Sequence, residues 1–168
     1  MSRSDIAELR ADRLSELEPL WLSLHRHHRE VADLPVLADE GLSWQRRCAW
    51  YRSRLEAGDA FALVARDDGE PVGYAFVHIR PGDDDTWPVG RHLAELVSLA
   101  VAPERRGDGV GTALLDAVDA ELERRGVHDL EVAVMAGNDR ARRFYERRGL
   151  RMGELLLFRF GGAGTESG

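Results

Sequence analysis

Residues 99–111, Leu-Ala-Val-Ala-Pro-Glu-Arg-Arg-Gly-Asp-Gly-Val-Gly, combine residue types that can bind an anion. An apolar run ends at Pro103, two arginines follow, and glycines alternate with other residues before an apolar pattern with helical spacing begins. This order predicts a strand, a turn of bare backbone and the start of a helix. Such a turn directs several N–H groups and the positive helix end at one point, which stabilises a phosphate group. The sequence therefore predicts a site for a phosphate-bearing ligand.

Two other kinds of phosphate-binding loop do not fit these residues. A Walker-type loop needs a lysine before Ser or Thr, and the chain contains no lysine. The dinucleotide fingerprint needs a third glycine three residues after the second, and Thr112 stands there.

The elements that must position this turn are predicted from apolar periodicity and from capping residues. A crossover between the strands at residues 93–101 and 130–136 makes them parallel, whereas the hairpin over residues 60–79 is antiparallel. A mixed sheet with helices on both faces follows, which is an α/β fold. The predicted strands are residues 6–11, 60–66, 72–79, 93–101, 130–136 and 150–160, and the predicted helices begin at Asp12, Ser43, Gly109 and Asp139.

The whole chain has the composition of one ordinary domain. Its 168 residues can bury roughly two thirds of their unfolded surface. A net charge of −7 argues against nucleic acid as a partner. No apolar run approaches the ~20 residues that span a bilayer, and the charged first thirty residues do not resemble a secretory signal, so no membrane partner is expected. The single cysteine, Cys48, agrees with a cytoplasmic location.

Two segments carry a resemblance to a known family. Residues 106–111, Arg-Gly-Asp-Gly-Val-Gly, follow a strand end of the form Val-x-Pro at residues 101–103. Residues 138–150 read Asn-Asp-Arg-Ala-Arg-Arg-Phe-Tyr-Glu-Arg-Arg-Gly-Leu. Together they resemble the two signatures of the GNAT superfamily of acyl-CoA-dependent N-acyltransferases, with Leu150 in place of a phenylalanine. The resemblance covers residues 60–160 well and the earlier residues only in layout.

The resemblance implies a fold, a donor and a reaction. The expected fold is a single N-acetyltransferase domain over residues 1–160 with a mixed sheet of about six to seven strands and about four helices, followed by a disordered tail at 161–168. The implied reaction transfers the acetyl group of acetyl-CoA directly to a primary amine of a small molecule or peptide, without a metal. Many members of the superfamily form dimers, so a homodimer is an expectation by analogy.

The resemblance also assigns cofactor-binding residues. Backbone N–H groups at the glycine turn would bind the CoA pyrophosphate. The main chain of Leu99 and Val101 would hold the pantetheine as an extra strand would, and one N–H there would polarise the thioester carbonyl. Asn138 would line the cofactor slot, although Asn-Asp is also a common helix start. The residues of the turn are Arg106, Gly107, Asp108, Gly109, Val110, Gly111 and Thr112.

Two side chains are candidate catalytic residues. By resemblance, Tyr145 protonates the departing thiolate, and Glu95, an acid in an otherwise apolar strand, accepts the proton of the amine. Each has a structural interpretation as well. Tyr145 would pack in the core beside Phe144, and Glu95 would be a solvated residue at an edge.

The acceptor pocket is predicted from the first two helices and from the loop at residues 80–92. Aromatic rings and carboxylates there suit an amine with an apolar body, but the same residues suit a core and a solvated turn. No metal site is expected at the histidines, because no cluster of Cys, Asp or Glu completes one. The candidates are Trp21, Leu24, His25, His28, Trp44, Trp50, Tyr51, Asp83, Asp84, Asp85 and Trp87.

Two other functions remain open at this point. A non-catalytic acyl-CoA-binding or sensor module would keep the glycine turn and lose the acid and the base, whereas both Glu95 and Tyr145 are present. A nucleotide-binding regulator would bind ATP or NAD more tightly than CoA.

Overall fold

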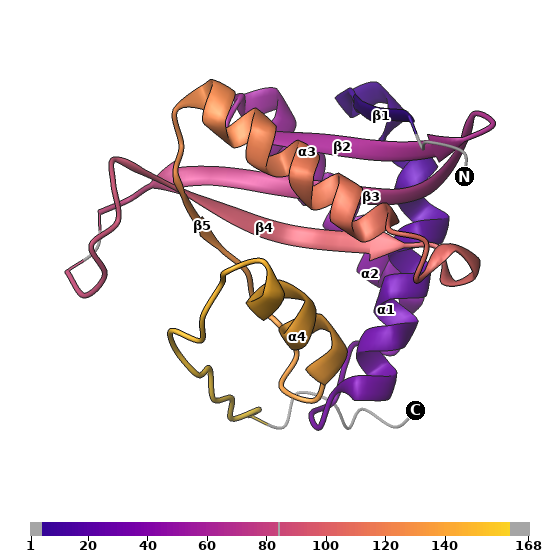
Figure 1. Cartoon of the computed structure of the whole chain (residues 1–168). Helices are drawn as coiled ribbons and strands as arrows, with labels where there is room; N and C mark the ends of the chain where they lie inside the picture. Colours follow the sequence, from indigo (N-terminus) through magenta and orange to yellow (C-terminus); the bar gives the residue numbers. More distant parts are fainter. Residues whose placement is uncertain (1–4, 84, 162–168) are drawn as a thin grey trace.

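The centre of the molecule is a sheet of five strands in the computed structural model, which describes residues 5–83 and 85–161 (Figure 1). The strands lie in the sheet in their chain order. The first four are antiparallel to their neighbours, and the last is parallel to the fourth, which confirms the predicted crossover. They are β1 (Asp5–Glu8), β2 (Ala60–Asp67), β3 (Glu70–Pro81), β4 (His92–Val101) and β5 (Asp129–Glu131).

Helices cover both faces of this sheet, as predicted (Figure 1). Helix α3 crosses one face, and the first two α-helices pack on the opposite face. Helix α4 follows β5 and lies beside α1, beyond the end of the strand ladder (Figure 1). The helices are the 3-10 helix η1 (Ala11–Leu17), α1 (Glu18–Val31), α2 (Glu40–Ala57), the short η2 (Pro103–Arg105), α3 (Val110–Arg125) and α4 (Asp139–Arg147).

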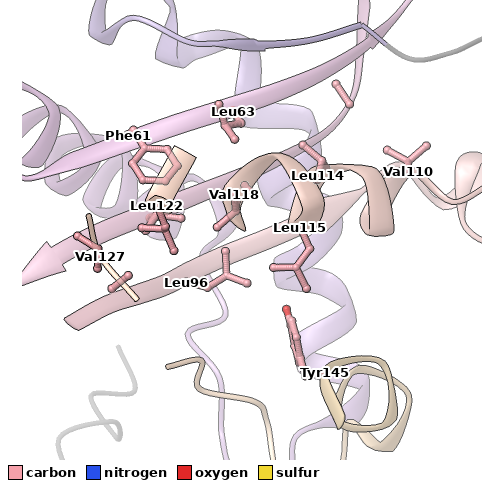
Figure 2. Packing of buried hydrophobic residues seen from close by; sticks show 14 of the residues in the cluster. Phe61, Leu63, Leu96, Val110, Leu114, Leu115, Val118, Leu122, Val127 and Tyr145 are labelled. Carbon is pink, nitrogen blue, oxygen red and sulfur yellow. The ribbon is translucent and has the colours of Figure 1, made fainter. Parts of the chain in front are cut away.

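Two apolar layers hold the helices on the sheet. On one face, the α3 side chains Leu114 and Val118 are fully buried against β2, β3 and β4 (Figure 2). On the other face, Tyr51 of α2 is fully buried and stacks on Phe76 of β3, with ring centroids 3.8 Å apart. Strands β2 and β3 are apolar at nearly every position because both of their faces are covered.

The start of α2 differs from the prediction. Asp39, not Ser43, caps the helix, because its carboxylate accepts a hydrogen bond from the N–H of Leu42 at 2.9 Å. Ser43 lies one turn inside the helix, where its buried hydroxyl is 3.3 Å from Nδ1 of His25. Gly58 ends α2 in a left-handed conformation, as predicted.

Strand β4 contains the irregularity that shapes the rest of the molecule. Its register with β3 shifts by one residue, so that Val77 lies opposite Leu96 while Phe76 lies opposite Ser98. Val97 is therefore the extra residue of a β-bulge. Pairing of β4 with β5 covers only three residue pairs and ends at Glu95, so the strand predicted over 130–136 is much shorter than expected.

The C-terminal segment corrects the expected strand count. The chain from residue 151 to residue 161 forms no strand, so the sheet has five strands among the described residues rather than six to seven. The run Leu155–Phe158 is continuously apolar, but its side chains are exposed and no strand pairs with it among the described residues. Leu157 is 90% exposed. Of the predicted disordered tail, residues 162–168 lie outside the described part of the chain.

The tight packing of α3 on β3 predicts that adding one methyl group at Gly73 lowers the stability of the fold. A Cβ on Gly73 would lie 2.9 Å from the carbonyl oxygen of Ala100 and 3.1 Å from a methyl carbon of Leu114. We expect Gly73→Ala to lower the free energy of unfolding by about 1–3 kcal/mol in urea, because backbone must move. Gly41→Ala, in the first turn of α2, is the matched control and should leave stability unchanged or slightly higher. Equal stabilities of the two variants would contradict this account.

Candidate functional site

A slot opens where β4 and β5 separate. It has a volume of about 70 Å³ and lies between β4 and the chain that follows β5. Helix α4 closes one side of it and α1 the other. Its lining residues are Leu96, Val97, Ser98 and Leu99 from β4; Val132, Ala133, Val134 and Met135 after β5; Asn138, Ala141 and Tyr145; and Leu24 and His28.

The main chain of β4 is free to bind a ligand along this slot. Among the described residues, no strand pairs with β4 beyond Glu95 on its β5 side, so backbone groups that point away from β3 lack ladder partners there. An extended ligand can take the place of the missing strand and accept or donate those hydrogen bonds. Leu99 lines the slot, and Val101 ends the strand beside the glycine turn.

The glycine turn has the backbone geometry that the sequence predicts. Gly107 and Gly109 have φ angles of 93° and 84°, a region that favours glycine. The N–H groups of Val110, Gly111 and Thr112 lie in the first turn of α3 and have no intrahelical partners. Gly109, which precedes the helix, has no side chain to cap them. A Cβ built on Gly107 or Gly109 meets no atom within 4 Å, so the approach to this backbone is open.

The side chains of the turn divide into an anchor and an exposed rim. Val110 is buried in the core beneath α3 and holds the turn against the sheet. Arg106 and Thr112 are exposed, and Nε of Arg106 donates to the carbonyl oxygen of Val101 at 3.3 Å. Asp108 is also exposed and forms an ion pair of 3.1 Å with Arg105. Because Asp108 is paired with Arg105, the exposed cation of Arg106 lies beside the free N–H groups of the turn.

Tyr145 extends from α4 to the slot and to the α3 core. Its side chain points toward Leu96 and Leu115, and the residue is only 9% exposed (Figure 2). Burial raises the pKa of the phenol to about 12, so it keeps its proton at neutral pH and can donate a hydrogen bond. The expected packing beside Phe144 is also present, with ring centroids 5.2 Å apart.

Asn138 has both of the roles that the sequence left open, because it caps α4 and also lines the slot. Its side-chain oxygen accepts a hydrogen bond from the N–H of Ala141 at 3.1 Å and caps α4. The same residue is 9% exposed and lines the slot. The cap fixes the direction of α4 and thereby the position of Tyr145.

Glu95 lies next to the slot, on the sheet face that α1 and α2 cover. Its carboxylate is half-buried, and Oε2 is 3.9 Å from Nδ1 of His78 on β3. Nε2 of the same imidazole is 3.7 Å from a carboxylate oxygen of Asp59, which stands just before β2. Sequence reasoning missed His78 and Asp59, because only the register of three strands brings them to Glu95.

His28, one of the predicted acceptor-pocket residues, lines the slot together with Leu24. It lies near the end of α1 and lines the slot from the side opposite α4. Burial, together with charge repulsion from His27, His25 and Arg47, lowers its pKa to about 4. Its imidazole is therefore neutral at physiological pH and can accept a hydrogen bond.

The predicted acceptor residues separate into core and surface. Trp21, Trp44 and Tyr51 are buried in the layer between α1, α2 and the sheet. Trp50 and Trp87 are 36% and 43% exposed. In the loop between β3 and β4, Asp83 and Asp85 are exposed, and Asp84 lies outside the described residues.

Within residues 5–83 and 85–161, no three His, Cys, Asp or Glu side chains form a group that could hold a metal ion. None of the helices in that part of the chain is both long and apolar enough to cross a membrane.

Sequence comparison identifies similar proteins. The model of the acetyltransferase (GNAT) family matches residues 21–150. A mycothiol acetyltransferase from Propionibacterium freudenreichii subsp. shermanii is 39% identical over 88 residues, which are 52% of this chain and 26% of that protein. An uncharacterized N-acetyltransferase from Archaeoglobus fulgidus is 37% identical over 122 residues, which are 70% of this chain and 72% of that protein.

Solved structures show the same fold. A GCN5-related N-acetyltransferase from Ralstonia eutropha matches with a TM-score of 0.77 and 19% identity, over 95% of this chain and 100% of that chain. An aminoglycoside N-acetyltransferase in complex with CoA matches with a TM-score of 0.67 and 18% identity, over 93% of this chain and 98% of that chain.

The low pKa of His28 predicts a pH dependence of stability. In the unfolded chain His28 binds a proton with the ordinary pKa of 6.5, whereas in the folded protein its pKa is about 4. The stability linked to His28 is therefore present above pH ~6.5 and is lost as the pH falls toward ~4. As the pH falls from ~6.5 to ~4, His28→Gln should lose less free energy of unfolding in urea than wild type. We expect a difference of about 1 kcal/mol, because partial exposure of the ring reduces the effect of its charge. Parallel curves for the two proteins would contradict the burial of this imidazole.

Proposed function

Because the chain belongs to the acetyltransferase (GNAT) family of acyl-CoA-dependent N-acyltransferases, we propose that it transfers the acetyl group of acetyl-CoA directly to a primary amine of a small molecule or peptide. The observation that carries this proposal is the slot, which joins a free β4 backbone to Tyr145 and leads to the glycine turn. The similar proteins are named for different acceptors, mycothiol and aminoglycosides, so their names do not select the acceptor of this chain.

The donor would bind along β4. The free N–H groups at the start of α3, with the guanidinium of Arg106, would stabilise the negative charge of the pyrophosphate. The pantetheine would pair with the unpaired side of β4 past Leu99 and bring the thioester to the bulge at Val97. A backbone N–H there would donate to the thioester oxygen as negative charge develops on it.

Two side chains of this chain would transfer protons in the reaction. The nitrogen of the amine forms a bond to the acetyl carbon, and the bond from that carbon to sulfur breaks. Glu95, directly or through a water, would accept the proton that the ammonium form of the acceptor must lose. Tyr145, protonated at neutral pH, would donate its proton to the departing thiolate. As the amide forms, its nitrogen loses a second proton to solvent, and solvent returns one proton to the tyrosinate.

The wider setting is part of the proposal. We expect residues 1–160 to act as one domain in the cytoplasm, with an amine as partner rather than nucleic acid or a membrane. The net charge of −7 and the single cysteine support this setting. A homodimer remains an expectation by analogy with the superfamily.

A thiol-release assay with acetyl-CoA and a panel of amines, peptides and aminoglycosides tests the proposed transfer. We expect Tyr145→Phe to lower kcat by about 100-fold or more on an acceptor that wild type uses, because the thiolate loses its proton donor. The KM for acetyl-CoA should change little. Because the chain contains no lysine, acetylation of its own lysine side chains does not contribute to the signal.

Phe144→Leu is the matched control, because it alters the neighbouring ring without removing a hydroxyl. Unchanged turnover in Tyr145→Phe would remove the tyrosine from the mechanism. Tight CoA binding with no transfer to any acceptor would favour the sensor module, and tighter binding of ATP or NAD than of CoA would favour a nucleotide-binding regulator.

Replacement of Glu95 tests the assigned base through pH. Glu95→Gln should lower kcat/KM at pH 7 and lose less as the pH approaches the pKa of the acceptor ammonium, about 10 for an alkylamine. At that pH the amine arrives without the proton that Glu95 would accept. A loss that is the same at every pH, measured as a full pH profile, would indicate that Glu95 only shapes the site.

A further inference from the structure

Arg47 of α2 lies in an aromatic setting on the acceptor side of the sheet. Its guanidinium carbon is 4.8 Å from the centroid of the Trp21 ring, 5.6 Å from that of Tyr51 and 5.8 Å from that of Trp50. These three rings hold the guanidinium by cation–π attraction and restrict its motion. The cation is therefore half-buried and fixed in place before any ligand arrives.

The charge of Arg47 is not matched by an acid. Among residues 5–83 and 85–161, no carboxylate lies within 4.0 Å of this guanidinium, and no hydrogen bond from it reaches another residue. Arg26 and Arg54 in the same pair of helices do find carboxylates, Glu40 and Asp59. A guanidinium carries five N–H donors in a planar fork that suits two oxygens of an anion. In Arg47 these donors are available to a ligand.

A series of side-chain contacts connects Arg47 to Glu95 and to the slot. The Trp50 ring, over which Arg47 lies, meets the His78 ring edge-on with centroids 5.5 Å apart. Nδ1 of His78 is in turn 3.9 Å from the carboxylate of Glu95. On the other side, the positive charge of Arg47 acts on His28, which lines the slot. Arg47 and Glu95 are therefore two charged ends of one surface, with Trp50 between them.

The guanidinium of Arg47 itself makes its end of this surface positive. His25 bonds to the carbonyl oxygen of Leu37 and faces Ser43, and His28 is neutral at physiological pH. The carboxylates of Asp59 and Glu95 both lie at the other end, on the two sides of His78. Because Asp59 is paired with Arg54, a ligand that spans the surface meets the cation of Arg47 at one end and the carboxylate of Glu95 at the other.

We propose that Arg47 binds an oxyanion of the acceptor, so that the acceptor of this enzyme carries a carboxylate or phosphate a short distance from its amine. The inference rests on the proposed acetyl transfer and narrows its acceptor to zwitterionic amines. The amine lies toward Glu95 and the slot, and the oxyanion accepts hydrogen bonds from the guanidinium fork. A polycationic amine would place like charge against Arg47 and would bind poorly.

The test uses product analogues on the full chain in the presence of CoA. The probes are N-acetylglycine, N-acetyl-β-alanine and N-acetyl-γ-aminobutyrate, each beside its carboxamide, and N-acetylphosphoethanolamine as the phosphate arm. The three lengths scan the distance between amine and anion. Tryptophan fluorescence reports binding, because Trp21 and Trp50 flank Arg47. Arg47→Gln removes the charge, and Arg46→Gln, an exposed neighbour on α2, is the matched control.

We expect one carboxylate or phosphate length to bind about 10- to 100-fold more tightly than the neutral analogue of the same length. Arg47→Gln should abolish this preference while keeping the melting temperature and CoA affinity of wild type, and Arg46→Gln should keep the preference. Equal binding of charged and neutral probes at every length, or a preference that survives in Arg47→Gln, would overturn the proposal. The arm that binds more tightly identifies the oxyanion as carboxylate or phosphate.

A kinetic arm separates this inference from the proposed function. Acetyl-CoA turnover is measured with glycine, β-alanine, γ-aminobutyrate and phosphoethanolamine, with the matching amino amides, and with spermidine. Turnover that favours the amides or spermidine overturns the oxyanion site and leaves acetyl transfer standing. An oxyanion preference in binding, without CoA affinity or transfer to any amine, overturns acetyl transfer and leaves the oxyanion site standing.

Discussion

The structure depends on the interruption of the hydrogen-bond ladder between β4 and β5. Strands β4 and β5 pair over three residue pairs and then separate, and a bulge at Val97 turns the main chain of β4 at the same place. An interrupted ladder leaves backbone donors and acceptors without partners, which is costly unless a ligand or water satisfies them. The slot, the position of α4 and the approach from the glycine turn all follow from this separation.

The aromatic layer on the α1 and α2 face holds the bulge in place. The hydroxyl of Tyr51 donates to Oγ of Ser98 at 2.7 Å, directly after the bulge, and its ring stacks on Phe76. Burial raises the pKa of Tyr51, so this donor keeps its proton. The same ring supports the guanidinium of Arg47. One residue of the core therefore links the shape of the slot to the position of the Arg47 charge.

The reliable sequence predictions concern local backbone. The glycine turn, the hairpin over residues 60–79 and the start of α3 at Gly109 were all predicted, because each depends on the conformation of a few adjacent residues. The last strand, the length of β5 and the cap of α2 were predicted wrongly. Strand formation depends on a partner that the local sequence does not contain, and two polar residues near a helix start compete for the cap.

The sequence by itself determined the fold family, the open backbone turn for a phosphate and the candidate pair Tyr145 and Glu95, because short patterns with specific spacing carry these features. Only the tertiary structure decided which distant side chains meet. His78 lies beside Glu95 through strand register, His28 enters the slot through the packing of α1, and Arg47 lies among three rings without an acid among the described residues. These contacts depend on packing between residues far apart in the sequence, so the spacing of residues along the chain does not predict them.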